Sequence, residues 1–121
     1  MDTASDNKGA AAPAEAQETT DGFHLIIDAL KLNDIDTIYG LPGIPITDFA
    51  RKAQAAGLRV ISFRHEQMAA HAADAYYRAS HKLAVLNVHL SPGMTNAITG
   101  VITAAADCTP MVVFSGNTQA Y

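Results

Sequence analysis

One carboxylate lies where a parallel α/β fold would place its chemistry. Glu66 follows the apolar run LRVISF at residues 58–63 and precedes an alanine-rich stretch. A buried strand over that run would deliver Glu66 to the carboxyl edge of a sheet, in the first turn of a helix, where ligands bind in folds of this type. A simpler interpretation is a helix-start residue that the helix dipole stabilises by roughly 0.3–1 kcal/mol. The position alone favours this simpler interpretation.

Two loops rich in glycine and proline accompany this carboxylate. The segment GLPGIP at residues 40–45 follows a strand-like run directly, and SPG at residues 91–93, with Asn96 behind it, follows another. Such loops are stiff and leave their backbone uncovered. They could form a rigid floor for a flat ligand, or they could be plain tight connections to the next helix. Two such loops flanking a carboxylate form a candidate site.

Several other kinds of site have no support in the sequence. GxGxxG, GxxxxGK[ST], GxSxG and HExxH are all absent. The five histidines show no i, i+4 pair, and Cys108 is the only cysteine, so we predict no metal site and no intrachain disulfide. We interpret these histidines as surface or packing residues: His24, His65, His71, His81 and His89.

Charge and composition restrict the partners. The net charge of -4 is already present in the first 21 residues, so the rest of the 121-residue chain is neutral. Without a basic face we expect no nucleic-acid binding. No window approaches the ~20 apolar residues of a membrane helix, and no secretory signal is present, so we expect a cytoplasmic protein without a membrane partner.

Hydrophobic periodicity divides the chain into a tail and four strand–helix cycles. Residues 1–19 lack branched aliphatic and aromatic side chains, which predicts a disordered acidic tail. Helices are expected from Asp21 to about residue 34, from Pro45 to Gly57, over residues 65–79 and over residues 92–107. Strands are expected over residues 37–39, 58–63, 83–88 and 111–114. This alternation predicts an α/β fold with a doubly wound parallel sheet and helices on both faces. The apolar runs LRVIS, LAVL and MVVF predict strands covered on both faces.

Four strands make a small sheet with an uncovered apolar edge. The last strand ends seven residues before the end of the sequence. Small open sheets with such an edge are poor free-standing units. We therefore expect residues 20–121 to be a truncated part of a larger domain.

The motifs together resemble a known family. YGLPGIP at residues 39–45, FRHEQ at 63–67 and SPGMTNA at 91–97 resemble the N-terminal pyrimidine-binding domain of thiamine-diphosphate-dependent decarboxylases and carboligases. Residues 20–67 look most like oxalyl-CoA decarboxylase within that family. From Met68 onward the match shifts toward acetolactate synthase and the carboligases. Pro42 stands where oxalyl-CoA decarboxylases tend to have an aliphatic residue.

The resemblance implies a role for each of these residues. Glu66 would be catalytic and bind the cofactor, by hydrogen-bonding the aminopyrimidine nitrogen of thiamine diphosphate and favouring the imino tautomer that deprotonates the thiazolium carbon. Ile44 would face the reacting substrate. The pyrimidine slot would be lined by Pro42, Gly43, Pro92, Gly93 and Asn96.

The resemblance also implies what this chain does not supply. Mg²⁺ and the diphosphate would be bound by a domain absent from this chain, and the full-length protein would be a homo-oligomer. The implied function is that of a lyase, oxalyl-CoA decarboxylase-like, that decarboxylates a small-molecule 2-oxo acid or acyl-CoA. Two alternatives are an acetolactate-synthase-like or 2-hydroxyacyl-CoA lyase carboligase, and a stand-alone α/β interaction domain that reuses the fold.

Overall fold

The structure is a computed structural model that describes residues 20–117. In chain order it contains α1 (Gly22–Leu32), β1 (Thr37–Gly40), α2 (Thr47–Ala55), β2 (Arg59–Ser62), α3 (Glu66–Ser80), β3 (Ala84–Val88), α4 (Leu90–Ala106) and β4 (Met111–Ser115). The predicted disordered tail, residues 1–19, lies outside the described residues. None of the helices within residues 20–117 has the length and apolarity needed to cross a membrane.

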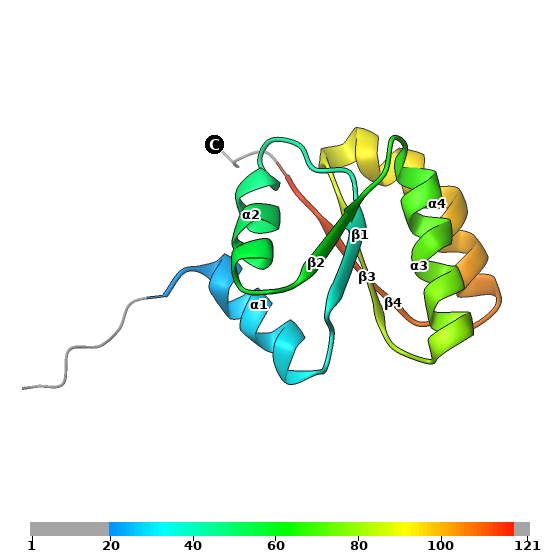
Figure 1. The fold of residues 1–121 in the computed structure, drawn as a ribbon. Coiled ribbons are helices and arrows are strands. Elements are labelled where there is room, and N and C mark those ends of the chain that lie inside the picture. Colours follow the sequence, from blue (N-terminus) through cyan, green and yellow to red (C-terminus); the bar gives the residue numbers. More distant parts are fainter. Residues whose placement is uncertain (1–19, 118–121) are drawn as a thin grey trace, which may run out of the picture.

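The four strands form one parallel sheet in the order β2-β1-β3-β4. Figure 1 shows α1 and α2 on one face of this sheet and α3 and α4 on the other. The predicted doubly wound α/β fold with helices on both faces is therefore confirmed. Because all strands are parallel, the loops that follow them lie at one edge of the sheet.

Alternating side chains of the two central strands build two cores. Ile38 and Val85 are fully buried against α1 and α2, in a cluster with Ile27 and Phe49. On the opposite face, Leu86 and Val88 lie against alanines of α3 and α4. The small side chains on that second face allow α3 and α4 to approach the sheet and each other closely.

One expectation about the strands is wrong. The runs LRVIS, LAVL and MVVF were expected to form strands covered on both faces, yet of these three only the strand over LAVL, β3, is fully buried, as is β1. The strands β2 and β4 are half-buried, because the observed order places them at the two edges of the sheet. An apolar run is typical of a buried strand, but the run itself does not reveal which strand becomes an edge.

The helix boundaries follow local signals in most places. Asp21 caps α1 by accepting a hydrogen bond from the backbone N–H of His24, and its hydrogen bond with Lys52 holds the pKa of Asp21 well below its usual range. The start of α4 is a correction, because this helix begins at Leu90 rather than at Pro92. Pro92 lies in the first turn, where the missing N–H of proline would have no helical partner anyway.

Gly100 lies at a close approach of α3 and α4. A Cβ added at Gly100 would lie 2.5 Å from the Cβ of Ala70 and 3.2 Å from the backbone nitrogen of His71. We expect Gly100→Ala to lower the free energy of unfolding by about 1–2 kcal/mol, because overpacking outweighs the helix propensity of alanine. Urea denaturation of the full-length protein and of this variant measures the change.

Gly22→Ala is the matched control, since Gly22 is also helical and a Cβ there would meet no atom within 4 Å. This variant should be as stable as the parent chain or more stable. Equal stability gains in Gly22→Ala and Gly100→Ala would contradict the close approach of the two helices.

Candidate functional site

Glu66 is the first residue of α3 and lies at the carboxyl edge of the sheet. The strand β2 ends at Ser62, and His65 caps the helix by accepting a hydrogen bond from the backbone N–H of Gln67 at Nδ1, over 3.2 Å. The side chain of Glu66 is 6% exposed. Burial of a carboxylate is unfavourable unless other groups hydrogen-bond it. A helix-start residue that only interacts with the helix dipole would be at the surface, so the burial needs a further explanation.

Asn96 supplies a hydrogen bond to this buried carboxylate. Its Nδ2 donates to Oε2 of Glu66 over 3.0 Å, which connects α4 to α3. Within residues 20–117, no protein donor is paired with the second oxygen, Oε1. The carboxylate therefore has one oxygen held by the protein and one oxygen left for a ligand.

Gly93 lies beside this second oxygen. A Cβ at Gly93 would be 3.2 Å from Oε1 of Glu66 and 3.4 Å from the Cβ of Val88. The absence of a side chain keeps Oε1 uncovered on the Gly93 side. Pro92, the neighbouring residue, is exposed in the first turn of α4.

The loop after β1 lies next to the end of β3. The backbone N–H of Leu41 donates to the carbonyl of Asn87 over 3.3 Å. Gly43 contacts His89, and a Cβ at Gly43 would lie 2.8 Å from Cγ of that imidazole ring. Pro42 and Ile44 are exposed, with Ile44 at 82% exposure. This loop is thus near the site, but its anchor is His89 rather than Glu66.

The predicted site residues therefore form two groups at one edge of the sheet. Glu66, Gly93 and Asn96 lie in mutual contact through the carboxylate. Gly43 belongs to a second group with His89. The positions are compatible with the predicted roles, and the role of each residue toward a ligand stays a prediction.

His89 was grouped by the sequence analysis with surface and packing histidines. It is half-buried at the end of β3, and its Nδ1 is buried without a hydrogen-bond partner among the described residues. The next residue, Leu90, has φ +50°, a strained conformation for a residue with a side chain. Unpartnered buried polar atoms and strained backbone concentrate at functional sites. The sequence signal was the position of His89 between a strand and the SPG segment.

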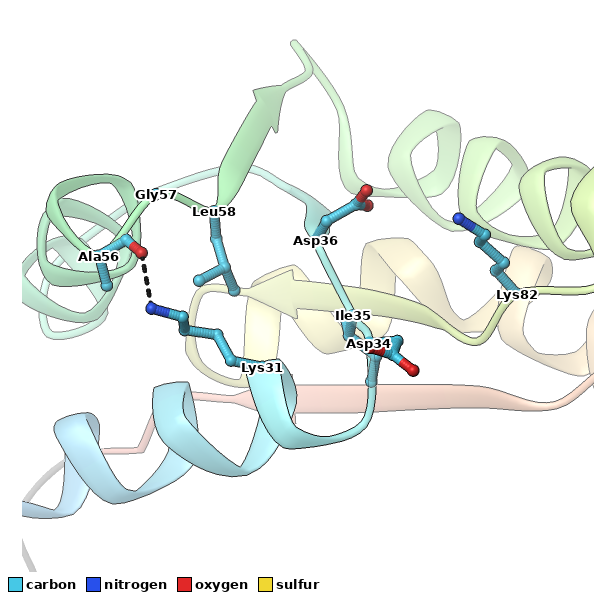
Figure 2. A pocket seen from close by; sticks show the side chains of 8 residues that line it. All are labelled: Lys31, Asp34, Ile35, Asp36, Ala56, Gly57, Leu58 and Lys82. Atoms are coloured by element: carbon cyan, nitrogen blue, oxygen red, sulfur yellow. Dashed lines mark hydrogen bonds between the residues drawn. The ribbon is translucent and has the colours of Figure 1, made fainter.

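A pocket of about 550 Å³ lies at the opposite edge of the sheet, where β1, β2 and β3 begin. Figure 2 shows Lys31 donating to the carbonyl of Ala56 at its rim, with Lys82 and Asp36 on the other side. The lining side chains carry both signs of charge, and the pocket is open to solvent. It contains no buried unpaired group that would indicate a ligand, so the carboxyl edge remains the candidate site.

Metal-binding groups are not gathered in the described part of the chain. Residues 20–117 contain no group of three or more His, Cys, Asp or Glu side chains that could hold an ion. Glu66 can support hydrogen bonding and proton exchange at this edge, next to Gly93.

Comparison with known proteins places this geometry in a family. Residues 20–121 match the family described as "Thiamine pyrophosphate enzyme, N-terminal TPP binding domain". Oxalyl-CoA decarboxylase of Escherichia coli K12 is 46% identical over 102 residues, which cover 84% of this chain and 18% of the relative. The acetolactate synthase large subunit of Parasynechococcus marenigrum is 44% identical over 108 residues, with 86% and 18% covered. The chain thus spans less than a fifth of the length of these relatives.

A solved structure shows the same fold. Benzoylformate decarboxylase from Polynucleobacter necessarius superimposes with a TM-score of 0.72, over 78% of this chain and 18% of that protein, at 22% sequence identity. At this identity the similarity concerns the arrangement of helices and strands. It agrees with the parallel sheet and the two helical layers described above.

The contact between Gly43 and His89 can be tested by a double-mutant cycle. Gly43→Ala places a methyl group against the imidazole ring, and we expect a loss of about 1–3 kcal/mol in the free energy of unfolding. In a His89→Ala background the space is open, so Gly43→Ala should cost less than about 0.5 kcal/mol. Urea denaturation of the four chains measures both values. Equal losses in the two backgrounds would show that His89 does not limit position 43.

Proposed function

The chain belongs to the thiamine pyrophosphate enzymes, as their N-terminal TPP-binding domain, and from this premise we propose that Glu66 activates the bound cofactor. The observation that carries the proposal is a buried carboxylate with one anchored oxygen and one free oxygen. A protonated nitrogen of the aminopyrimidine ring would be stabilised by such a carboxylate acceptor where water is excluded. Hydrogen bonds to ionised groups are roughly twice as strong as those between neutral groups.

The residues at this edge fit a flat aminopyrimidine ring. Oε1 of Glu66 can accept a hydrogen bond from the ring, and Gly93 leaves that oxygen uncovered. Pro42, Gly43 and Pro92 would line the slot, and Ile44, which is 82% exposed, would face the substrate. When bound, thiamine diphosphate supplies an electron sink for the carbanion that forms next to a carbonyl group.

Glu66 would act by holding and moving a proton at Oε1. The carboxylate of Glu66 would hold the bound ring by accepting a hydrogen bond from its protonated nitrogen. Burial of Glu66 strengthens the interaction, because water competes less for the same oxygen. Pro42, Gly43 and Gly93 would orient the ring without covering Oε1.

The other half of the site would come from outside the described residues. We infer that the chain is part of a longer lyase in which another domain binds the diphosphate and Mg²⁺ and in which subunits associate as a homo-oligomer. The short span of the chain along its relatives supports this. A Gly-Asp-Gly motif with a following Asn in the downstream reading frame would agree, and the absence of both would contradict it.

The reaction proposed is release of CO₂ from a 2-oxo acyl-CoA. The 46% identity to an oxalyl-CoA decarboxylase supports this substrate class. The 44% identity to an acetolactate synthase supports an acetolactate-synthase-like carboligase as the alternative, with a 2-hydroxyacyl-CoA lyase as a further one. Assays of the full-length protein with oxalyl-CoA and with pyruvate distinguish decarboxylation from acetolactate formation. Activity with neither, together with no thiamine diphosphate binding, would favour a stand-alone interaction domain.

Glu66→Gln in the full-length protein tests the proposed role. Glutamine keeps the size and one acceptor oxygen but cannot carry the charge that favours the protonated ring. We expect thiamine diphosphate to bind and turnover to fall by about 10²–10⁴-fold, the usual range for a general acid–base group. Isothermal titration and steady-state assays at saturating cofactor measure the two quantities.

Asp48→Asn is the matched control, because Asp48 is an exposed carboxylate in the first turn of α2. It removes the same helix-dipole interaction, so it should lose at most about 1 kcal/mol of stability and keep its turnover. Normal turnover of Glu66→Gln at saturating thiamine diphosphate would remove Glu66 from the mechanism.

A further inference from the structure

We propose that Asn96 is a positioning residue that acts through Glu66, and that Gly100 sets the helix separation at which Asn96 reaches the carboxylate. The inference rests on the proposed function of Glu66. It gives Asn96 a role different from direct contact with the cofactor, which the family resemblance implies. It also adds Gly100, one helical turn after Asn96, to the residues on which the site depends.

The first observation is the direction of the hydrogen bond. Nδ2 of Asn96 donates to Oε2 of Glu66 over 3.0 Å, while Oε1 lies on the side of Gly93. A carboxylate can rotate about its last side-chain bond, and a donor on one oxygen restricts that rotation. Asn96 therefore determines which oxygen faces the ligand and how the plane of the carboxylate is oriented.

The second observation is the spacing along the two helices. Asn96 and Gly100 are four residues apart on α4, and Glu66 and Ala70 are four apart on α3. Residues at this spacing lie on the same helix face. The Asn96–Glu66 hydrogen bond and the Gly100–Ala70 contact are thus successive contacts along one interface, where an added Cβ at Gly100 would lie 2.5 Å from that of Ala70.

The hydrogen bond between Asn96 and Glu66 depends on this approach. An amide side chain has limited reach, and hydrogen bonds weaken steeply outside their normal geometry. A methyl group at position 100 must push the helices apart or shift one along the other. Either movement displaces Asn96 relative to Glu66 without touching the bound cofactor.

The two possible roles of Asn96 predict different kinetics. A residue that contacts the cofactor should mainly change the Kd of thiamine diphosphate. A residue that orients Glu66 should mainly change turnover at saturating cofactor, and it should have no effect once the charge of Glu66 is gone. The second criterion separates a positioning role from a general structural one, which would lower turnover in either background.

The experiment uses Asn96→Ala in the full-length protein, alone and combined with Glu66→Gln. We expect Asn96→Ala to lower turnover about 10–100-fold, as removal of groups that orient a reactive ligand commonly does. The Kd of thiamine diphosphate should change by less than about 3-fold, and in the Glu66→Gln background the added loss of turnover should be below about 2-fold. Isothermal titration and steady-state assays give these values.

Two further variants support the test. If the alanine variant does not fold, Asn96→Asp replaces it in the test. Asn96→Asp keeps the size of the side chain but replaces the donor with a like charge, so its turnover should fall by at least about 10-fold. Gly100→Ala should show the same pattern as Asn96→Ala, with turnover reduced and the Kd retained. Thr103→Ala is the control on α4, because the Thr103 hydroxyl donates only to the carbonyl of Thr99.

Three outcomes would overturn the inference. A Kd raised by about 10-fold or more with unchanged turnover would indicate direct contact of Asn96 with the cofactor. An equal loss of turnover in both backgrounds would show that Asn96 acts independently of Glu66. Unchanged turnover in Asn96→Ala would remove its role, whereas unchanged turnover in Glu66→Gln would reject the proposed function itself.

Discussion

The buried charge of Glu66 is the constraint on which the arrangement of this domain depends. A carboxylate that is 6% exposed requires a hydrogen-bond partner, and the partner comes from another helix, 30 residues further along the chain. The two helices must therefore be held at a fixed distance. Gly100 and Ala70 make that distance possible, because no larger side chain separates the two backbones.

The parallel sheet positions α3 and α4 so that both helices begin at the same edge of the sheet. Its order, β2-β1-β3-β4, brings the segments after β1, β2 and β3 to the same edge, although these segments are distant in sequence. Leu86 and Val88 of β3 pack against the alanines of α3 and α4 that face the sheet. Because the central strands are fully buried, the edge that carries Glu66 and Gly93 rests on a well-packed core.

The two oxygens of Glu66 have different neighbours in this arrangement. Oε2 accepts a hydrogen bond from the exposed residue Asn96 of α4, and Oε1 lies beside Gly93. A carboxylate held by donors on both oxygens would be a purely structural group. A carboxylate without any donor would be too costly to bury as a charge. The intermediate situation is the one expected of a group that must be fixed in place and still bind a ligand.

The sequence by itself determined the elements and the type of site. Apolar spacing and caps such as Asp21 set the helices and strands, because these signals act between residues close in the chain. The motifs YGLPGIP, FRHEQ and SPGMTNA resemble the family that the comparisons confirm. The expected role of each residue came from the family resemblance. The residue pattern located the candidate site at the carboxyl ends of the strands.

Only the tertiary structure decided which residues meet. The sequence did not reveal that β2 and β4 are edge strands, since strand order depends on pairing between distant segments. The resemblance placed Asn96 at the cofactor slot, and the folded chain shows in addition that its amide is bonded to Glu66. His89 was expected at the surface or in packing, and the structure shows which residue it packs against, Gly43. The helix start at Leu90 was also missed, because a proline is compatible with any position in a first turn. Hydrogen bonds and contacts of this kind are fixed by packing across the sheet, and local periodicity carries no information about them.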